Sequence, residues 1–255
     1  MLKQIPNIFT LLNLICGCIA IVYTMQNGIT IKYDADGAQF IDLSEKLWMA
    51  SLFIGIAAVV DFLDGFVARL FNASSEMGKQ LDSLADVVSF GVAPSMIIYQ
   101  FLRMSFASDE GGIDTSVFLL APAFIMAAAG AYRLARFNID TTQQYGFKGV
   151  PIPAAGLLVA SLPLIYWNAT NEIIIDLLTN KLFLYTLILI VSGLMVSKLP
   201  LMALKFKNLS IKSNLSKFIL IIFSIVAAVI FKWLAVPIIF IAYIILSLAF
   251  KNKQA

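Results

Sequence analysis

The chain has 255 residues, of which 60% are hydrophobic and only 13% are charged, and its mean hydropathy is +0.91. A soluble domain carries about a quarter charged residues, so this composition excludes that class and indicates an integral membrane protein. The formal net charge of +3 is too small to indicate nucleic-acid binding. The chain contains no histidine, which excludes imidazole catalysis and disfavours a zinc site with the usual ligands.

Eight apolar segments of near-spanning length follow one another along the chain. In order, they cover residues 8–25, 47–70, 84–104, 117–138, 153–168, 183–198, 217–232 and 235–250. The fifth is short, but Pro151 and Pro153 at its beginning suit the start of a helix. The pattern predicts an all-α, polytopic integral membrane bundle of about eight transmembrane helices. The connection at 26–46 is polar and acidic, and it contains no recognisable motif.

Basic residues are distributed unevenly between the alternate connections of these segments. One side carries 13 of the 18 lysines and arginines. The other side carries only Lys32, Lys46, Arg103, Lys181 and Lys232. Because basic residues accumulate on the inner side of membrane proteins, the richer side is expected to be cytoplasmic. The sequence therefore predicts a multi-pass protein of the inner membrane with both termini in the cytoplasm.

Four aspartates lie in or beside the second and third apolar segments: Asp61, Asp64, Asp82 and Asp86. A carboxylate at a membrane-helix position is costly and by default marks a functional site. The spacings of three and four residues place each pair on one face of its helix. If the two helices pack antiparallel, four carboxylates converge, and their repulsion requires hard cations such as Mg²⁺, Mn²⁺ or Ca²⁺. The alternative is a set of interhelical hydrogen bonds without chemistry.

The residues between these aspartates suit a phosphate-bearing ligand. Gly65 and Ala68 are small, so a ligand could approach the backbone closely, and Gly78 leaves the helix face before Asp82 open. Arg69 and Lys79 supply positive charge for a phosphate. Two ions side by side would hold both oxygens of an in-line phosphoryl displacement.

Residues 61–86 read D-x2-D-G-x2-A-R-x8-G-x3-D-x3-D, which resembles the signature of the CDP-alcohol phosphatidyltransferases. Four flanking blocks are similar to the bacterial and archaeal phosphatidylserine synthases of that superfamily. These blocks are PNIFTLLNLICG at 6–17, LDSLADVVSFGVAPS at 81–95, AYRLARFN at 131–138 and GVPIPAAG at 149–156. The resemblance covers about residues 5–200. It implies a catalytic domain over 1–200 with a six-helix core, followed by a helix pair of the same bundle over 201–255.

The resemblance also implies a reaction. A phosphatidyl group would pass from CDP-diacylglycerol to the hydroxyl of L-serine, giving phosphatidylserine and CMP. Asp61, Asp64 and Asp82 would hold two divalent ions, Mg²⁺ or Mn²⁺, with Asp86 contributing to the metal site and acting as general base. The turn from Gly65 through Ala68 to Arg69 would hold the cytidine diphosphate, with Gly78 and Lys79 beside it. Members of the family are homodimers, so a homodimer among membrane lipids is expected.

Polar residues outside the signature are candidates for substrate contacts. Arg133 and Arg136 could bind the serine carboxylate or donor phosphates, or could be anchors at the inner membrane surface. Ser89 shares the face of Asp82 and Asp86, where it could contact serine or bond its own helix. Thr10 and Asn13 share a face of the first segment and could contact the nucleotide, although Thr10 could instead cap that helix.

Two alternatives remain open at this point. The first keeps the chemistry but changes the acceptor to glycerol 3-phosphate or inositol, and an anionic phosphate acceptor calls for extra basic residues near the site. The second is a divalent-cation transporter in which the aspartates form a permeation site. The transporter reading leaves Gly65, Ala68, Arg69 and Gly78 unexplained.

Overall fold

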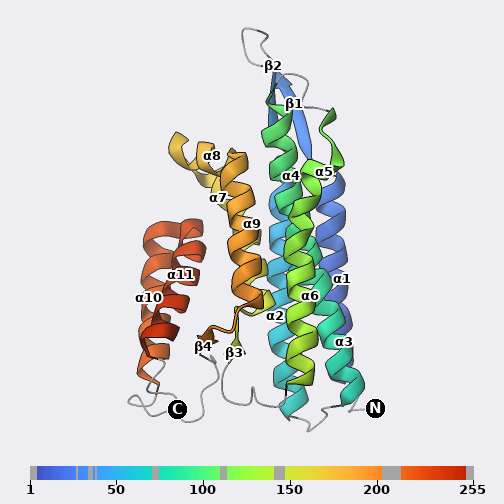
Figure 1. Ribbon diagram of the computed structural model, residues 1–255, viewed down its shortest axis with the longest axis vertical. Coiled ribbons are helices and arrows are strands. Elements are labelled where there is room, and N and C mark those ends of the chain that lie inside the picture. The colour runs from blue at the N-terminus through green and yellow to red at the C-terminus, as the bar shows by residue number, and fades with distance from the viewer. Residues whose placement is uncertain are drawn as a thin grey trace.

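A computed structural model of the chain describes residues 5–26, 28–33, 37, 39–70, 75–109, 114–140, 147–202 and 214–250. Long helices that run side by side form the body of the molecule (Figure 1). The first group is α1 (Ile5–Gln26), α2 (Trp48–Leu70), α3 (Glu76–Asp86), α4 (Ala93–Ala107) and α6 (Ile125–Ile139). The second group is α7 (Ile152–Asn168), α8 (Glu172–Thr179), α9 (Lys181–Val196), α10 (Leu215–Phe231) and α11 (Ala235–Ala249). Short helical turns are η2 (Glu45–Leu47), α5 (Val117–Leu120), η5 (Ala121–Phe124) and η6 (Lys232–Leu234).

The central helix of the bundle is built from three consecutive elements. The π-helix η3 (Val87–Val92) joins α3 to α4, so that Glu76–Ala107 is one helix of 32 residues. Its middle and far end supply much of the core, where Phe90, Ile97 and Phe101 are fully buried. The helix begins at Glu76 rather than at residue 84, because Ser75 caps it by accepting the N–H of Gly78 at 2.9 Å. Its first turns are polar, so hydropathy alone missed them.

All eight predicted apolar segments are helical, and the predicted polytopic membrane bundle is confirmed. Within the described ranges, five helices are long and apolar enough to cross a membrane, or six if α8 and α9, which meet at 68°, form one span. This count is lower than eight because α7 has only 17 residues and Leu215–Ala249 qualifies as a single stretch. That stretch folds back at Lys232, which has a φ of 50°, so α10 and α11 lie side by side (Figure 1).

Two small antiparallel sheets depart from the all-α prediction. Strands β1 (Ile29–Tyr33) and β2 (Gln39–Leu43) form a hairpin in the register Ile29 with Leu43 and Tyr33 with Gln39. The hairpin lies at the end of the bundle opposite α3 (Figure 1). Asp42 attaches it to the bundle by accepting the Tyr166 hydroxyl at 2.6 Å, and it pairs with Lys32 at 2.7 Å.

The second sheet joins β3 (Phe147–Lys148) to β4 (Pro200–Leu201) near the α3 end of the bundle. Gly149 follows β3 with a φ of +79°, a conformation that favours glycine. A Cβ at Gly149 would lie 2.3 Å from the Met195 carbonyl oxygen, so only glycine lets this loop pack against the end of α9. The next residue, Val150, donates its N–H to the Leu194 carbonyl and thereby positions the start of α7.

Candidate active site

The four aspartates come from two neighbouring helices. Asp61 and Asp64 lie near the end of α2, and Asp82 and Asp86 lie in α3. One carboxylate oxygen from each of Asp61, Asp64 and Asp82 lies within 4.8 Å of the other two. Asp86 is outside this set, but it is close enough to interact electrostatically with Asp61 and Asp82. Three of the four carboxylates therefore converge as predicted, and the fourth, Asp86, interacts with them electrostatically.

This cluster has the donor set and the geometry of a divalent-cation site. Three oxygens at such separations repel unless a cation or protons lie between them, and hard carboxylate oxygens suit Mg²⁺, Mn²⁺ and Ca²⁺. One oxygen of Asp82 is buried and accepts no hydrogen bond from the described part of the chain. A buried carboxylate oxygen without a donor is unfavourable, and a bound cation would satisfy it. The residues present therefore fit a metal ion.

Helix α1 supplies two polar side chains that hold the aspartates in place. The Thr10 hydroxyl is 2.9 Å from Asp64 Oδ2, and Asn13 Nδ2 donates to Asp86 Oδ1 at 3.3 Å. Thr10 and Asn13 are buried, as are Asp64 and Asp86. The sequence singled out these two residues for nucleotide contact, and it gave no sign of their bonds to the aspartates. Their three-residue spacing places both side chains on one face of an apolar helix, which indicates a polar partner without identifying the aspartates as that partner.

Ser89 follows Asp86 on the π-helix η3 and points toward α1. It is fully buried, and its hydroxyl donates to the Asn13 carbonyl oxygen at 2.9 Å. Gly17 lies against it, since a Cβ there would be 2.4 Å from Ser89 Oγ. The structure thus places Ser89 in the contact between two helices, beside the residue that bonds Asp86. A contact of Ser89 with serine stays a prediction.

The remaining signature residues lie on α2 and α3 near the aspartates in the sequence, and their surroundings differ. Gly65 and Ala68 are half-buried on α2, while the side chain of Arg69 lies outside the described residues. A Cβ at Gly78 would lie 3.0 Å from Asn7 Oδ1, so this glycine lets α3 approach the start of α1. Lys79 is exposed and donates to the Asn138 carbonyl at 3.0 Å. Its ammonium is thus bound to α6 and not directed at the aspartates.

The two arginines of α6 differ in burial and in the groups that they contact. Arg133 is only 6% exposed and interacts electrostatically with Asp86, and its guanidinium lies 5.9 Å from the centre of the Phe137 ring. Arg136 is half-buried, and its Nη1 donates to the Val196 carbonyl at the end of α9 at 3.2 Å. Both arginines are on α6, but Arg133 is the buried one, and it interacts electrostatically with Tyr243 and, more weakly, with Asp86.

Comparison with known proteins gives the family. A family model described as CDP-alcohol phosphatidyltransferase matches residues 3–197, which include all four aspartates. The chain belongs to the CDP-alcohol phosphatidyltransferase family. It is therefore a transferase of phospholipid biosynthesis, and the resemblance of residues 61–86 to the family signature is confirmed.

Three similar proteins have names that refer to serine. The chain is 37% identical over 220 residues to the CDP-diacylglycerol–serine O-phosphatidyltransferase of Helicobacter pylori, covering 85% of this chain and 78% of the relative. It is 30% identical over 251 residues to the Mycobacterium bovis protein of that name, covering 95% and 76%. It is also 37% identical over 123 residues to the archaetidylserine synthase of Methanothermobacter thermautotrophicus, covering 48% of each chain.

Proposed function

We propose that this CDP-alcohol phosphatidyltransferase transfers the phosphatidyl group of CDP-diacylglycerol to the hydroxyl of L-serine, giving phosphatidylserine and CMP. The observation that carries the proposal is the convergence of Asp61, Asp64 and Asp82 beside the buried Asp86. The names of relatives that align with most of the chain support serine as the acceptor.

The cluster on α2 and α3 would hold two divalent ions, Mg²⁺ or Mn²⁺, with Asp86 contributing to the second. When bound, such ions neutralise the diphosphate of the donor and the charge on the departing phosphate. The carboxylates need a partner of this kind because they lie at the cytoplasmic end of apolar helices. Thr10 and Asn13 keep Asp64 and Asp86 oriented toward the cluster.

The transfer needs one proton acceptor and no covalent intermediate. The serine Oγ forms a bond to the β-phosphorus of the donor while the bond from that phosphorus to the CMP oxygen breaks. Asp86 takes the hydroxyl proton, and CMP leaves with the electron pair of the broken bond. Asp86 suits this role because it is buried, accepts a hydrogen bond from Asn13 through one oxygen, and is close enough to Asp61 and Asp82 to interact with them electrostatically.

Arg133 is the better placed of the two arginines to bind the carboxylate of serine. Arg133 is buried and interacts electrostatically with Asp86, so a serine whose carboxylate pairs with the guanidinium would direct its hydroxyl toward the base. Our candidates for binding the cytidine diphosphate are Gly65, Ala68, Arg69, Gly78 and Lys79. Additional candidates for substrate contacts are Ser89, Arg136, Thr10 and Asn13.

The cellular setting is part of the same proposal. The side to which the sequence assigns 13 of the 18 basic residues includes the connection between α2 and α3, and we assign that side to the cytoplasm together with both termini, in the inner membrane. Lys3, Lys205 and Lys251, which are counted in that sequence-based assignment, lie outside the described residues. We also propose a homodimer, and a division into a catalytic domain over 1–200 and a helix pair over 201–255. The match of the family to residues 3–197 supports the division.

An acceptor screen that monitors CMP release tests the function. Purified protein with CDP-diacylglycerol and Mn²⁺ should release CMP with L-serine, but not with glycerol 3-phosphate or inositol. Preference for either of the other alcohols would keep the chemistry and overturn serine as acceptor. Divalent-cation flux into proteoliposomes, with no CMP release for any alcohol, would overturn the enzyme and favour a transporter.

A further inference from the structure

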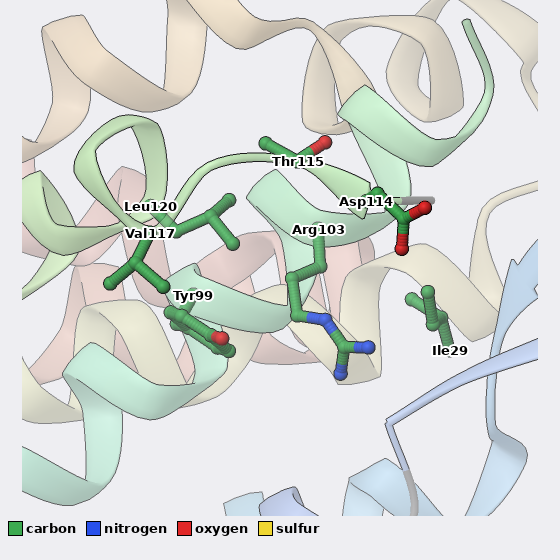
Figure 2. Close-up of a pocket in the computed structure, with 7 residues that line it drawn as sticks. All are labelled: Ile29, Tyr99, Arg103, Asp114, Thr115, Val117 and Leu120. Atoms are coloured by element: carbon green, nitrogen blue, oxygen red, sulfur yellow. The ribbon is translucent and has the colours of Figure 1, made fainter. Parts of the chain in front are cut away.

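A second polar site lies at the end of the bundle far from the aspartates. Arg103 is on α4, and 17 residues of helix separate it from Asp86, or about 25 Å along the helix axis. It lines a cavity of about 340 Å³ together with Tyr99, Ile29, Asp114, Thr115, Val117 and Leu120. Figure 2 shows the guanidinium in the middle of this cavity, with Tyr99 on one side and Ile29 and Asp114 on the other.

The guanidinium is held in position and retains donors for a ligand. Its Nη1 donates to Gln100 Oε1 at 3.2 Å, and Gln100 is itself buried and donates to the Thr24 carbonyl at 2.9 Å. Gln100 also packs against Gly28, where a Cβ would lie 2.7 Å from its oxygen. Because this is the one hydrogen bond that the guanidinium makes to the described residues, its other N–H groups can donate to a ligand inside the cavity.

Two other cations at this end of the bundle are neutralised within the chain. Lys32 pairs with Asp42 at 2.7 Å, and Lys181 forms an ion pair with Asp109 beside a neighbouring cavity. Among the described side chains, no carboxylate pairs with Arg103, although Asp114 lines the same cavity. A cation in a membrane-spanning helix is costly, and one that faces a cavity without an internal counter-ion points to an anionic ligand.

The mouth of the cavity adjoins the surface that faces lipid. Val117 lines it, and the neighbouring Phe118 is 89% exposed at the beginning of the span Val117–Ile139. An apolar surface this exposed at the boundary of a candidate span is suited to contact acyl chains. A ligand with its phosphate at Arg103 would therefore extend its tails over α5.

We propose that this cavity binds the headgroup of an amine-bearing phospholipid in the leaflet opposite the active site. The phosphodiester would accept from the Arg103 guanidinium, and the ammonium would lie beside the Asp114 carboxylate and the Tyr99 ring. The two opposite charges line one cavity without pairing with each other, which is the arrangement that a zwitterionic headgroup complements. The site is independent of phosphatidyl transfer.

Native mass spectrometry of the full chain, released from detergent micelles, tests this site. Phosphatidylethanolamine and phosphatidylglycerol with identical acyl chains serve as probes. Wild type should retain phosphatidylethanolamine about threefold better than phosphatidylglycerol, as expected for one exposed ion pair. Arg103→Gln should lower phosphatidylethanolamine binding about tenfold, whereas Lys46→Gln, an exposed cation at the same end, should not change it. Equal binding by Arg103→Gln and wild type would overturn the proposal.

A second variant and a competition measurement complete the test. Asp114→Asn changes an exposed residue and should remove the preference for the amine headgroup, so a preference that persists would contradict the role of Asp114. Phosphoethanolamine without acyl chains should displace the lipid only weakly. Displacement as strong as by the whole lipid would assign the cavity to a soluble phosphate ester and overturn the membrane assignment. CMP release by Arg103→Gln, equal to that by wild type, verifies that the variant is folded.

Discussion

Asp86 differs from the other three aspartates in its immediate surroundings. It is buried, it accepts a hydrogen bond from Asn13, and Arg133 lies near it, whereas Asp61, Asp64 and Asp82 gather around a common point. This difference supports separate roles, with three carboxylates mainly as ligands and the fourth mainly as proton acceptor.

Replacing Asp86 by asparagine separates these roles. Asp86→Asn should lower kcat by about 10²–10⁴-fold, because the amide cannot take the serine proton. The Kd for CDP-diacylglycerol should stay within a few-fold of wild type, since the other three carboxylates remain. Steady-state CMP release and equilibrium donor binding measure the two quantities. Asp176→Asn, which changes an exposed residue, serves as the control and should leave both kcat and the donor Kd unchanged. A kcat for Asp86→Asn near that of wild type would show that Asp86 does not accept the proton.

The two arginines of α6 should differ in their effect on serine. Arg133→Ala should raise the KM for serine by about tenfold or more, the value of one charge-assisted hydrogen bond, with a smaller effect on the donor. Arg136→Ala should change the KM for serine less, because that side chain donates to the Val196 carbonyl. Initial rates at varied serine concentration measure both. An unchanged KM for serine in Arg133→Ala would exclude Arg133 from the serine pocket.

Residue identity and spacing were sufficient to predict the aspartate cluster. Spacings of three and four residues fix which side chains share a helix face, and their cost in a membrane indicates function. The bonds from Thr10 and Asn13 could not be predicted, because they depend on how far α1 is rotated and shifted against α2 and α3. The different surroundings of Arg133 and Arg136 depend likewise on the packing of α6 against α9.

At the scale of the elements, the contact between α1 and η3 positions the site. Gly17 and Ser89 meet closely, one turn of α1 away from Asn13, and Ser89 bonds the Asn13 backbone. A π-helix directly after Asp86 widens the helix where it faces α1, and such turns are frequent at functional sites.

A methyl group at this contact should disturb both stability and activity. Gly17→Ala would place a Cβ 2.4 Å from Ser89 Oγ and 2.7 Å from its Cα, so the helices must separate. Overpacking of this kind costs about 1–3 kcal/mol. We expect a lower midpoint of thermal unfolding and a lower kcat. Gly55→Ala on α2 is the matched control, because nothing lies within 4 Å of its added Cβ; equal behaviour of the two variants would contradict the importance of this contact.

The elements that the sequence did not predict are those in which hydropathy is uninformative. The β1–β2 hairpin lies in a polar connection, and its pairing and its attachment through Tyr166 are long-range. The break between residues 232 and 235 was predicted, but the positive φ of Lys232 that reverses the chain there was not, since neither Gly nor Pro stands at that point. The long apolar helices were predictable, because their length and composition are local properties.

For the whole molecule, the two ends of the bundle should face different compartments. In intact cells, a membrane-impermeant maleimide should label Glu45→Cys beside the hairpin, and it should label Ser75→Cys before α3 only after lysis. Both variants would be made after replacing Cys16 and Cys18. The charge distribution along the sequence provides the reason, since the side predicted to be cytoplasmic carries 13 of the 18 basic residues. Labelling of Ser75→Cys in intact cells would reverse the orientation and place the active site outside.

The proposed phosphatidyl transfer requires that the carboxylates of α2 and α3 hold divalent ions. Electron paramagnetic resonance of Mn²⁺, with purified protein and CDP-diacylglycerol, measures this directly. Wild type and Asp176→Asn should each bind about two Mn²⁺ per chain. Asp61→Asn, Asp64→Asn and Asp82→Asn should each bind fewer and release CMP more slowly. Undiminished Mn²⁺ binding in all three of these variants would contradict the proposed metal site and the chemistry built on it.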